Sequence, residues 1–261
     1  MKKAILLSLG VLFTVLFGLF LYSNYQFRSL NDRFVQLVPG MEERIALIDI
    51  GNSDRAAIAR KIVEIAACNP RVIGVDLFFK DYDKENFQDS VLLQSIREGK
   101  CILGAANKGI GIHNVHRRFR EAALNVGYAE LNQKKGLVSD FYVYSDSPTR
   151  RDYHMAYLMA SQYDSLAASA FLASLEGNNP DVVISRLTSQ FKIFQPDELL
   201  DCGMIRDRMV ILGYLGPEDQ FRTYTRYRDG IDDDGPDMYG AVIIANQVLM
   251  ILDKPPTDLP E

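Results

Sequence analysis

Several signatures of enzymes and cofactor sites are missing from this chain of 261 residues. No G-x-S-x-G, G-x-x-x-x-G-K-[ST] or H-E-x-x-H motif occurs, so the sequence offers no nucleophile elbow, P-loop or zincin site. Only 3 histidines are present, and no C-x-x-C pair accompanies them, so a zinc site is not expected. We therefore expect a protein that is not an enzyme and holds no metal ion or organic cofactor.

Cysteine is also scarce, with Cys68, Cys101 and Cys202 as the only examples. Their odd number and wide spacing signal no disulfide framework. We expect them to be small buried apolar residues, although one pair could form a disulfide in an oxidising compartment.

Positive charge is in deficit, because the formal net charge of the whole chain is −5. Without Lys2 and Lys3 at the start, 27 basic residues face 34 acidic ones, which gives −7. Nucleic acid is therefore not an expected partner.

Long apolar runs are limited to one, from Ala4 to Tyr22, which has about 19 uncharged residues and is long enough to cross a bilayer. A cleavable signal peptide is the alternative, but such peptides have a shorter apolar region and a small-residue cleavage site, which SNYQFR does not provide. Lys2 and Lys3 precede the run, so the positive-inside rule leaves the N-terminus in the cytoplasm. We expect residues 1–27 to be a single-pass anchor in the inner (plasma) membrane, with an extracytoplasmic, periplasmic body.

The body, residues 28–254, reads as one domain in which strands and helices alternate, followed by a tail at 255–261. Strands are expected at residues 44–50, 72–79 and 101–106, with amphipathic helices between them. Continuous hydrophobicity in these strands indicates burial on both faces. The expected fold is α/β, with a mainly parallel sheet covered by helices on both faces.

Later segments add to this plan. Residues 127–131 and 137–144 flank NQKKG and predict a β-hairpin insertion. A long helix is expected at 153–175, a buried strand at 208–216 and a closing apolar helix at 239–252. Short strands are expected at VVISRL and FKIF.

Two carboxylates, Asp49 and Asp76, fall near the ends of two of these strands. Ligands bind at that edge of an open α/β sheet, so we expect the two to be neighbours at a functional edge. A structural role is the alternative for each, because a carboxylate at a strand end often accepts hydrogen bonds from the following loop.

Six segments together resemble the CHASE2 sensor domain, an extracytoplasmic module of bacterial membrane receptors. They are RIALIDI, RVIGVDLFF, the segment at Gly127, YDSLAASAFLA, RMVILGYLGPEDQF and DMYGAVIIANQV, and they cover nearly all of the body in the family's order. The resemblance implies that Asp49, Asp76, Gly213, Asp219, Gly240 and Asn246 occupy recurrent positions.

The family is thought to detect extracellular signals ahead of further membrane helices and a cytoplasmic output domain. This sequence departs from it in three ways: it has no tryptophan, Ile244 stands where a histidine is frequent, and it ends at Glu261 without an output domain. Signalling through this polypeptide alone is therefore not expected, unless the chain continues beyond Glu261 or a partner supplies the output.

Arginines supply a further candidate surface. Arg222 and its neighbours in FRTYTRYRDG, together with Arg117, Arg118 and Arg120, could form a cationic rim for an anionic ligand, or they could lie in solvated loops.

The sequence thus predicts an anchored CHASE2-like sensor whose ligand- or partner-binding residues are Asp49, Asp76, Gly213, Asp219, Arg222 and Asn246. Its occupant would be an unknown small-molecule signal or a membrane protein partner. Two alternatives remain: an anchored hydrolase that uses Asp49 and Asp76 around a divalent cation, and a scaffold for another membrane protein.

Overall fold

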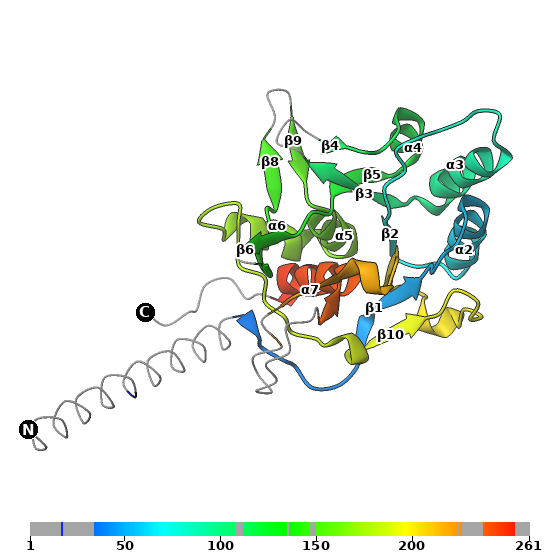
Figure 1. The fold of residues 1–261 in the computed structure, drawn as a ribbon. Helices are drawn as coiled ribbons and strands as arrows, with labels where there is room; N and C mark the ends of the chain where they lie inside the picture. Colours follow the sequence, from blue (N-terminus) through cyan, green and yellow to red (C-terminus); the bar gives the residue numbers. More distant parts are fainter. Residues whose placement is uncertain are drawn as a thin grey trace, which may run out of the picture.

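A mainly parallel sheet runs through the domain, with helices packed against both faces (Figure 1). The computed structural model describes residue 17 and residues 34–107, 112–134, 136–146, 150–223, 225 and 237–253. The α/β class with a mainly parallel sheet is confirmed.

The central sheet has seven strands in the order β10-β1-β11-β2-β3-β4, and β5 pairs with β3. All pairs are parallel except β3–β4. The strands are β1 (Glu42–Asp49), β2 (Val72–Asp76), β3 (Ile102–Asn107), β4 (Ile112–His113), β5 (Asn125–Tyr128), β10 (Phe191–Phe194) and β11 (Met209–Gly213).

Both faces of this sheet are buried, because successive strand residues point to opposite sides. Ile45 and Leu47 enter one core with α5, α6 and α7, while Ala46 and Ile48 enter the other with α2, α3 and α4. This explains the continuous apolar runs of the sequence. The helices are α2 (Arg55–Ala67), α3 (Phe87–Gly99), α4 (Arg117–Ala122), α5 (Met155–Tyr163), α6 (Ser165–Ala173) and α7 (Gly240–Asp253).

The expected hairpin is present but shorter than predicted. Its strands are β6 (Asn132–Lys134) and β7 (Leu137–Asp140), which pair antiparallel. The segment at Gly127 belongs to β5 instead and runs parallel to β3. The prediction was wrong there because alternating apolar residues do not reveal which strand a segment pairs with.

The expected long helix at 153–175 is two helices, α5 and α6, that meet at Asp164. Asp164 has extended backbone angles, and its side chain accepts hydrogen bonds from Leu166 N–H and Ala167 N–H. The prediction missed the break because an aspartate inside an apolar stretch can act as an N-cap.

Cys68 and Cys202 form a disulfide, whereas Cys101 is a buried free thiol. The bond joins the end of α2 to the 3-10 turn η2 (Cys202–Met204) across a sequence separation of 134. The disulfide is the alternative that the sequence left open, and Cys68 and Cys101 are buried as expected. The sequence could not say which two cysteines pair, because the fold brings Cys68 and Cys202 together from widely separated positions.

The expected anchor at residues 4–22 lies outside the described residues except for Phe17, and the tail at 255–261 lies outside them too. Within the described part of the chain, none of the helices combines the length and the hydropathy that a bilayer crossing requires. The anchor therefore stays a prediction from sequence.

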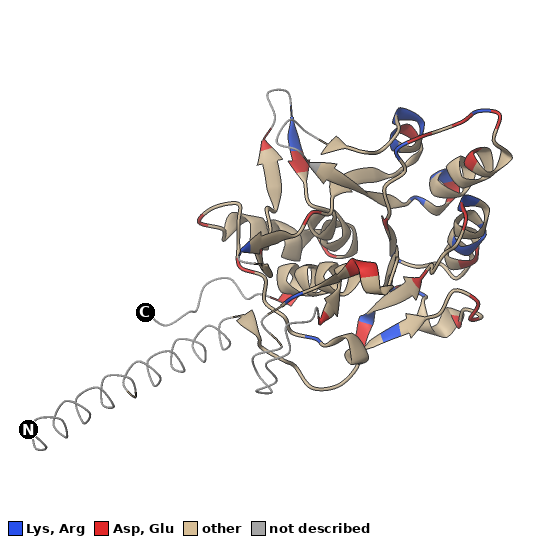
Figure 2. Ribbon diagram, in the orientation of Figure 1, with Lys and Arg blue, Asp and Glu red and all other residues tan. Residues whose placement is uncertain are grey.

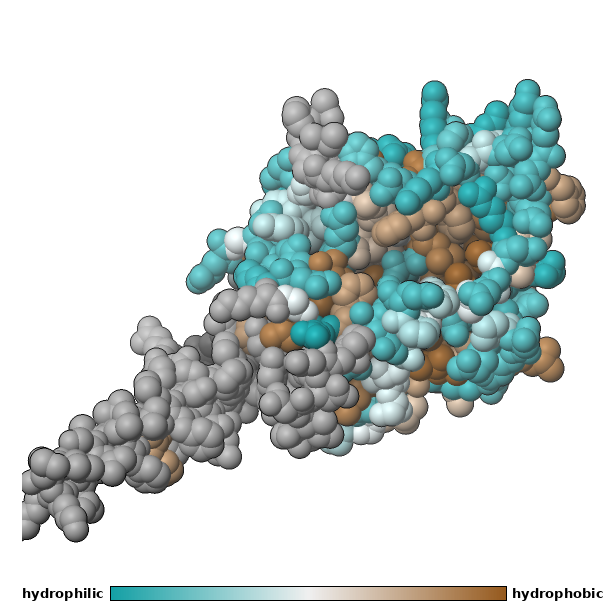
Figure 3. All heavy atoms as spheres, in the orientation of Figure 1, coloured by the Kyte–Doolittle hydropathy of each residue, from teal (hydrophilic) through white to brown (hydrophobic). Residues whose placement is uncertain are grey.

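The space-filling view shows one face of the domain. Hydrophilic residues dominate its periphery, while hydrophobic residues are concentrated toward the middle (Figure 3). Among the described residues, the most exposed large apolar side chains are Phe87, Leu166 and Leu199, which come from three separate segments.

Candidate functional site

Strand register places a row of residues across the carboxyl edge of the sheet. Asp49 of β1 pairs with Gly213 of β11, and Gly213 pairs in turn with Asp76 of β2. On the far side of Asp76 lies Gly104 of β3, which pairs with Gly127 of β5. These residues lie on the sheet face that α5 and α7 cover, because paired residues share a face.

Glycines on both sides of Asp76 give its side chain room. A Cβ built on Gly104 would lie 3.3 Å from Asp76 Oδ1, and one built on Gly213 would lie 3.9 Å from Asp76 Oδ2. A glycine inside a strand often marks such a close approach. Gly213 was expected at the site from the sequence, whereas Gly104 was not, although a glycine inside an apolar strand was the available signal.

Asp219 reaches the same place from a different segment. It ends the 3-10 turn η3 (Pro217–Asp219), and the antiparallel pair β12 (Gln220–Phe221) and β13 (Met238–Tyr239) holds this turn beside the start of α7. Gly240 N–H, at the first position of α7, donates to Asp219 Oδ2 at 3.2 Å. Figure 2 shows the acidic turn next to that helix.

Asp76 and Asp219 form the electrostatic centre of this edge. Burial, together with the smaller effect of the negative charge on Asp219, raises the pKa of Asp76 to about 7. Burial also raises the pKa of Asp219 to about 6, although the hydrogen bond from Gly240 opposes the rise. Both groups therefore change charge near neutral pH, because their pKa values lie well above that of an ordinary aspartate.

Among the residues that the structure describes, none donates a hydrogen bond to the Asp76 carboxylate, although the residue as a whole keeps partial contact with solvent. A desolvated carboxylate without a donor is costly in its charged form. The Asp76 carboxylate is stabilised either by taking up a proton or by binding a cationic or hydrogen-bond donor group of a ligand or partner.

Asp49 differs from Asp76, because its carboxylate is engaged by the backbone. Oδ1 accepts from Gly51 N–H at 2.9 Å and from Leu215 N–H at 3.0 Å. These bonds fix the loops that follow β1 and β11. The arrangement matches the structural alternative for a strand-end carboxylate.

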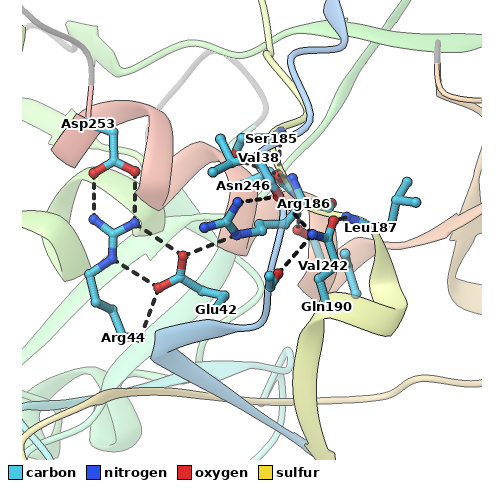
Figure 4. A network of polar contacts seen from close by, with 11 residues as sticks. Val38, Glu42, Arg44, Ser185, Arg186, Leu187, Gln190, Val242, Asn246 and Asp253 are labelled. Carbon is cyan, nitrogen blue, oxygen red and sulfur yellow. Dashed lines mark hydrogen bonds and ion pairs between the residues drawn. The ribbon is translucent and has the colours of Figure 1, made fainter.

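Asn246 lies inside α7 and is fully buried. Its Oδ1 accepts from the N–H groups of Ser185 and Arg186, at 2.8 and 2.9 Å, and its Nδ2 donates to the carbonyls of Arg186 and Val242 (Figure 4). The amide thus holds the 185–186 segment against α7. The structure does not bring Asn246 to the Asp76–Asp219 pair.

A polar network that the sequence analysis missed lies beside Asn246. Glu42 is 4% exposed and binds both Arg44 and Arg186, and Arg44 also binds Asp253 at the end of α7 (Figure 4). Burial alone would raise the pKa of Glu42, but the two arginines outweigh it and lower the pKa. The network joins the start of β1 to the end of α7.

Arg222 lies next to β7, where its carbonyl accepts from Val138 N–H at 2.9 Å. The other arginines of the expected cationic rim, Arg117, Arg118 and Arg120, lie on α4. The rim is therefore divided between two elements, and most of the loop around Arg222 lies outside the described residues.

The geometry gives little support to a metal-dependent hydrolase at Asp49 and Asp76. β11 separates their strands, which places their backbones roughly 9–10 Å apart. Across the described part of the chain, three or more histidine, cysteine, aspartate or glutamate side chains nowhere gather to suit a metal ion.

Comparison with known proteins gives one finding. The model of the CHASE2 domain matches residues 5–260, which is nearly the whole chain. No curated protein and no solved structure matches significantly. The chain that carries these strand-end aspartates and the glycine at the end of β11 therefore belongs to the CHASE2 domain family, a family of extracellular sensory domains.

Proposed function

We propose that this chain is an extracytoplasmic sensor, held in the inner membrane by residues 4–22, and that its signal acts at the Asp76–Asp219 pair. Membership of a sensory family supports the role, and the Cys68–Cys202 disulfide fits an oxidising compartment outside the cytosol. The proposed topology has a cytoplasmic N-terminus and a periplasmic body.

One observation carries the choice of site. Asp76 is a desolvated carboxylate without a donor among the described residues, and a second carboxylate, Asp219, lies beside it. A ligand or partner that presents an ammonium, guanidinium or other donor group would stabilise the ionised pair. Binding near neutral pH would therefore release protons, because the free pair is partly protonated there.

α7 offers a route from this site to the rest of the domain. Its first residue, Gly240, binds Asp219, and its last residue, Asp253, binds Arg44 at the start of β1. The helix has 14 residues, so it spans about 21 Å. A change of charge at the pair acts on one end of this helix, and the other end is tied to the segment that follows the proposed anchor.

Thermal unfolding of the purified chain in detergent tests the proposal. The probes are putrescine and spermidine, which present ammonium groups, and each is measured at pH 8 and pH 5.5 on the wild type, Asp76→Asn and Asp219→Asn. Asp81→Asn, which removes an exposed carboxylate, is the matched control.

We expect at least one probe to raise the melting temperature of the wild type and the control at pH 8. The same probe should have little effect on Asp76→Asn and Asp219→Asn, and a weaker effect on the wild type at pH 5.5. Stabilisation that persists in both variants would place the binding elsewhere and contradict the proposal.

A further inference from the structure

A cavity of about 250 Å³ lies at the β5 edge of the sheet, between α4, α5 and β9 (Arg151–Tyr153). Apolar side chains of Ile112, Val126 and Leu158 form part of its wall, and each of them is largely buried. Arg120 and Asp152 also line it. The volume is slightly below the ~300–1,000 Å³ of pockets for drug-sized ligands, so the cavity suits a metabolite.

Arg120 is held in place by backbone carbonyls. Its Nη2 donates to the carbonyl of Ile112 at 3.2 Å and to that of Val115 at 3.5 Å. Its Nε is buried and has no hydrogen-bond partner among the described residues. Backbone carbonyls therefore hold Nη2 of the guanidinium, and the Nε–H donor is unused among the described residues.

Asp152 is the acidic counterpart of Arg120 in this cavity. It is 4% exposed, and its Oδ1 binds Arg150 Nε at 2.7 Å. Its Oδ2 is buried without a hydrogen-bond partner in the described part of the chain. Arg151, which also lines the cavity, instead pairs with Asp146 on the exposed side.

We propose that this cavity binds a small carboxylic acid that also carries a hydrogen-bond donor, namely an amino acid or a hydroxy acid. The carboxylate of the ligand meets the Arg120 guanidinium, and its amino or hydroxyl group meets the free oxygen of Asp152. Leaving such buried groups unpaired costs free energy, which a ligand with both groups recovers.

The two unpaired atoms are buried, so the side chains turn slightly when the ligand enters. For Asp152 this is a rotation about its last torsion, which has a broad energy minimum. The cavity lies on different elements from Asp76 and Asp219, so this proposal can be tested independently of the proposed function.

Isothermal titration of the purified chain in detergent, with the twenty standard amino acids, glycolate, lactate and malate, tests the proposal. Acetate and ethylamine are the matched probes that carry only one of the two groups. We expect at least one amino or hydroxy acid to bind, and acetate and ethylamine to bind at least about tenfold more weakly.

Arg120→Gln and Asp152→Asn should each weaken that binding at least about tenfold. Arg117→Gln, which removes an exposed guanidinium of α4 that does not line the cavity, should leave it nearly unchanged. Ala123→Leu fills the cavity without changing a charge, so it tests the site even if a charge variant fails to fold. Asp76→Asn should bind normally.

Two results would overturn the proposal. The first is that no amino or hydroxy acid binds the wild type at millimolar concentration. The second is that binding is unchanged in the single variant Ala123→Leu and also in a single variant, Arg120→Gln or Asp152→Asn, that folds.

Discussion

Replacing Asp76 by asparagine should stabilise the protein at alkaline pH. In the wild type the pKa of Asp76 is about 7 in the folded protein, against an ordinary value of 3.8. Between these values the folded state binds more protons than the unfolded state, so the free energy of unfolding falls as the pH rises. The contribution of the Asp76 carboxyl to the free energy of unfolding is fully present below about pH 4 and is lost by about pH 7.

The magnitude follows from the difference between the two pKa values. Each pKa unit is worth ~1.4 kcal/mol, so the ionised Asp76 costs at most about 4 kcal/mol. The side chain keeps some contact with water, and we therefore expect about 2 kcal/mol. In a domain of this size that is a rise of about 4–8 °C in melting temperature for Asp76→Asn at pH 8.

Circular dichroism melts between pH 5 and pH 8 measure this effect. Asp76→Asn should gain most at pH 8 and little at pH 5, while Asp81→Asn should follow the wild type throughout. Equal destabilisation of Asp76→Asn at both pH values would contradict this prediction, because it would mean that the carboxylate makes essential contacts. The comparison stops at pH 5 because Glu42, whose pKa is lowered, loses its stabilising effect below its ordinary pKa of 4.5.

Three other substitutions test the framework. Asn246→Ala leaves two backbone N–H groups without their acceptor and should lower the free energy of unfolding by roughly 2–4 kcal/mol in urea titrations; no loss would refute the clamp on α7. Glu42→Ala removes the buried carboxylate that joins Arg44 to Arg186 and should cost about 3 kcal/mol in the same assay, whereas an unchanged free energy of unfolding would show that the network does not contribute to stability. Cys68→Ser opens a long covalent loop and should cost about 4 kcal/mol, with wild type in reductant as the matched comparison; free thiols at both Cys68 and Cys202 in the oxidised protein would contradict the bond.

Local sequence patterns predicted the central strands because burial on both faces leaves a clear trace. RIALIDI and RVIGVDLFF became β1 and β2, and the strand expected at 208–216 became β11. Strand order was not available from the sequence, because β11 inserts between β1 and β2 from far along the chain. That insertion separates Asp49 from Asp76, which the sequence suggested were neighbours.

The roles of the candidate residues were harder to predict than their positions. Asp49 and Asp76 have the same residue type and the same place at a strand end, yet backbone N–H groups bind only the first of them among the described residues. Which carboxylate finds donors depends on the loops that follow each strand. The side-chain amide of Asn246 likewise binds a segment some 60 residues away in the sequence, and local sequence patterns cannot predict such a contact.

Carbon-13 NMR titration of the Asp76 and Asp219 carboxyl groups measures the two pKa values on which the proposed site depends. Both carboxyls should titrate between about pH 6 and pH 7, and Asp76 should titrate at lower pH in Asp219→Asn. Two carboxyls that titrate independently near pH 4 would be ordinary solvated aspartates, and the proposed site would then be wrong.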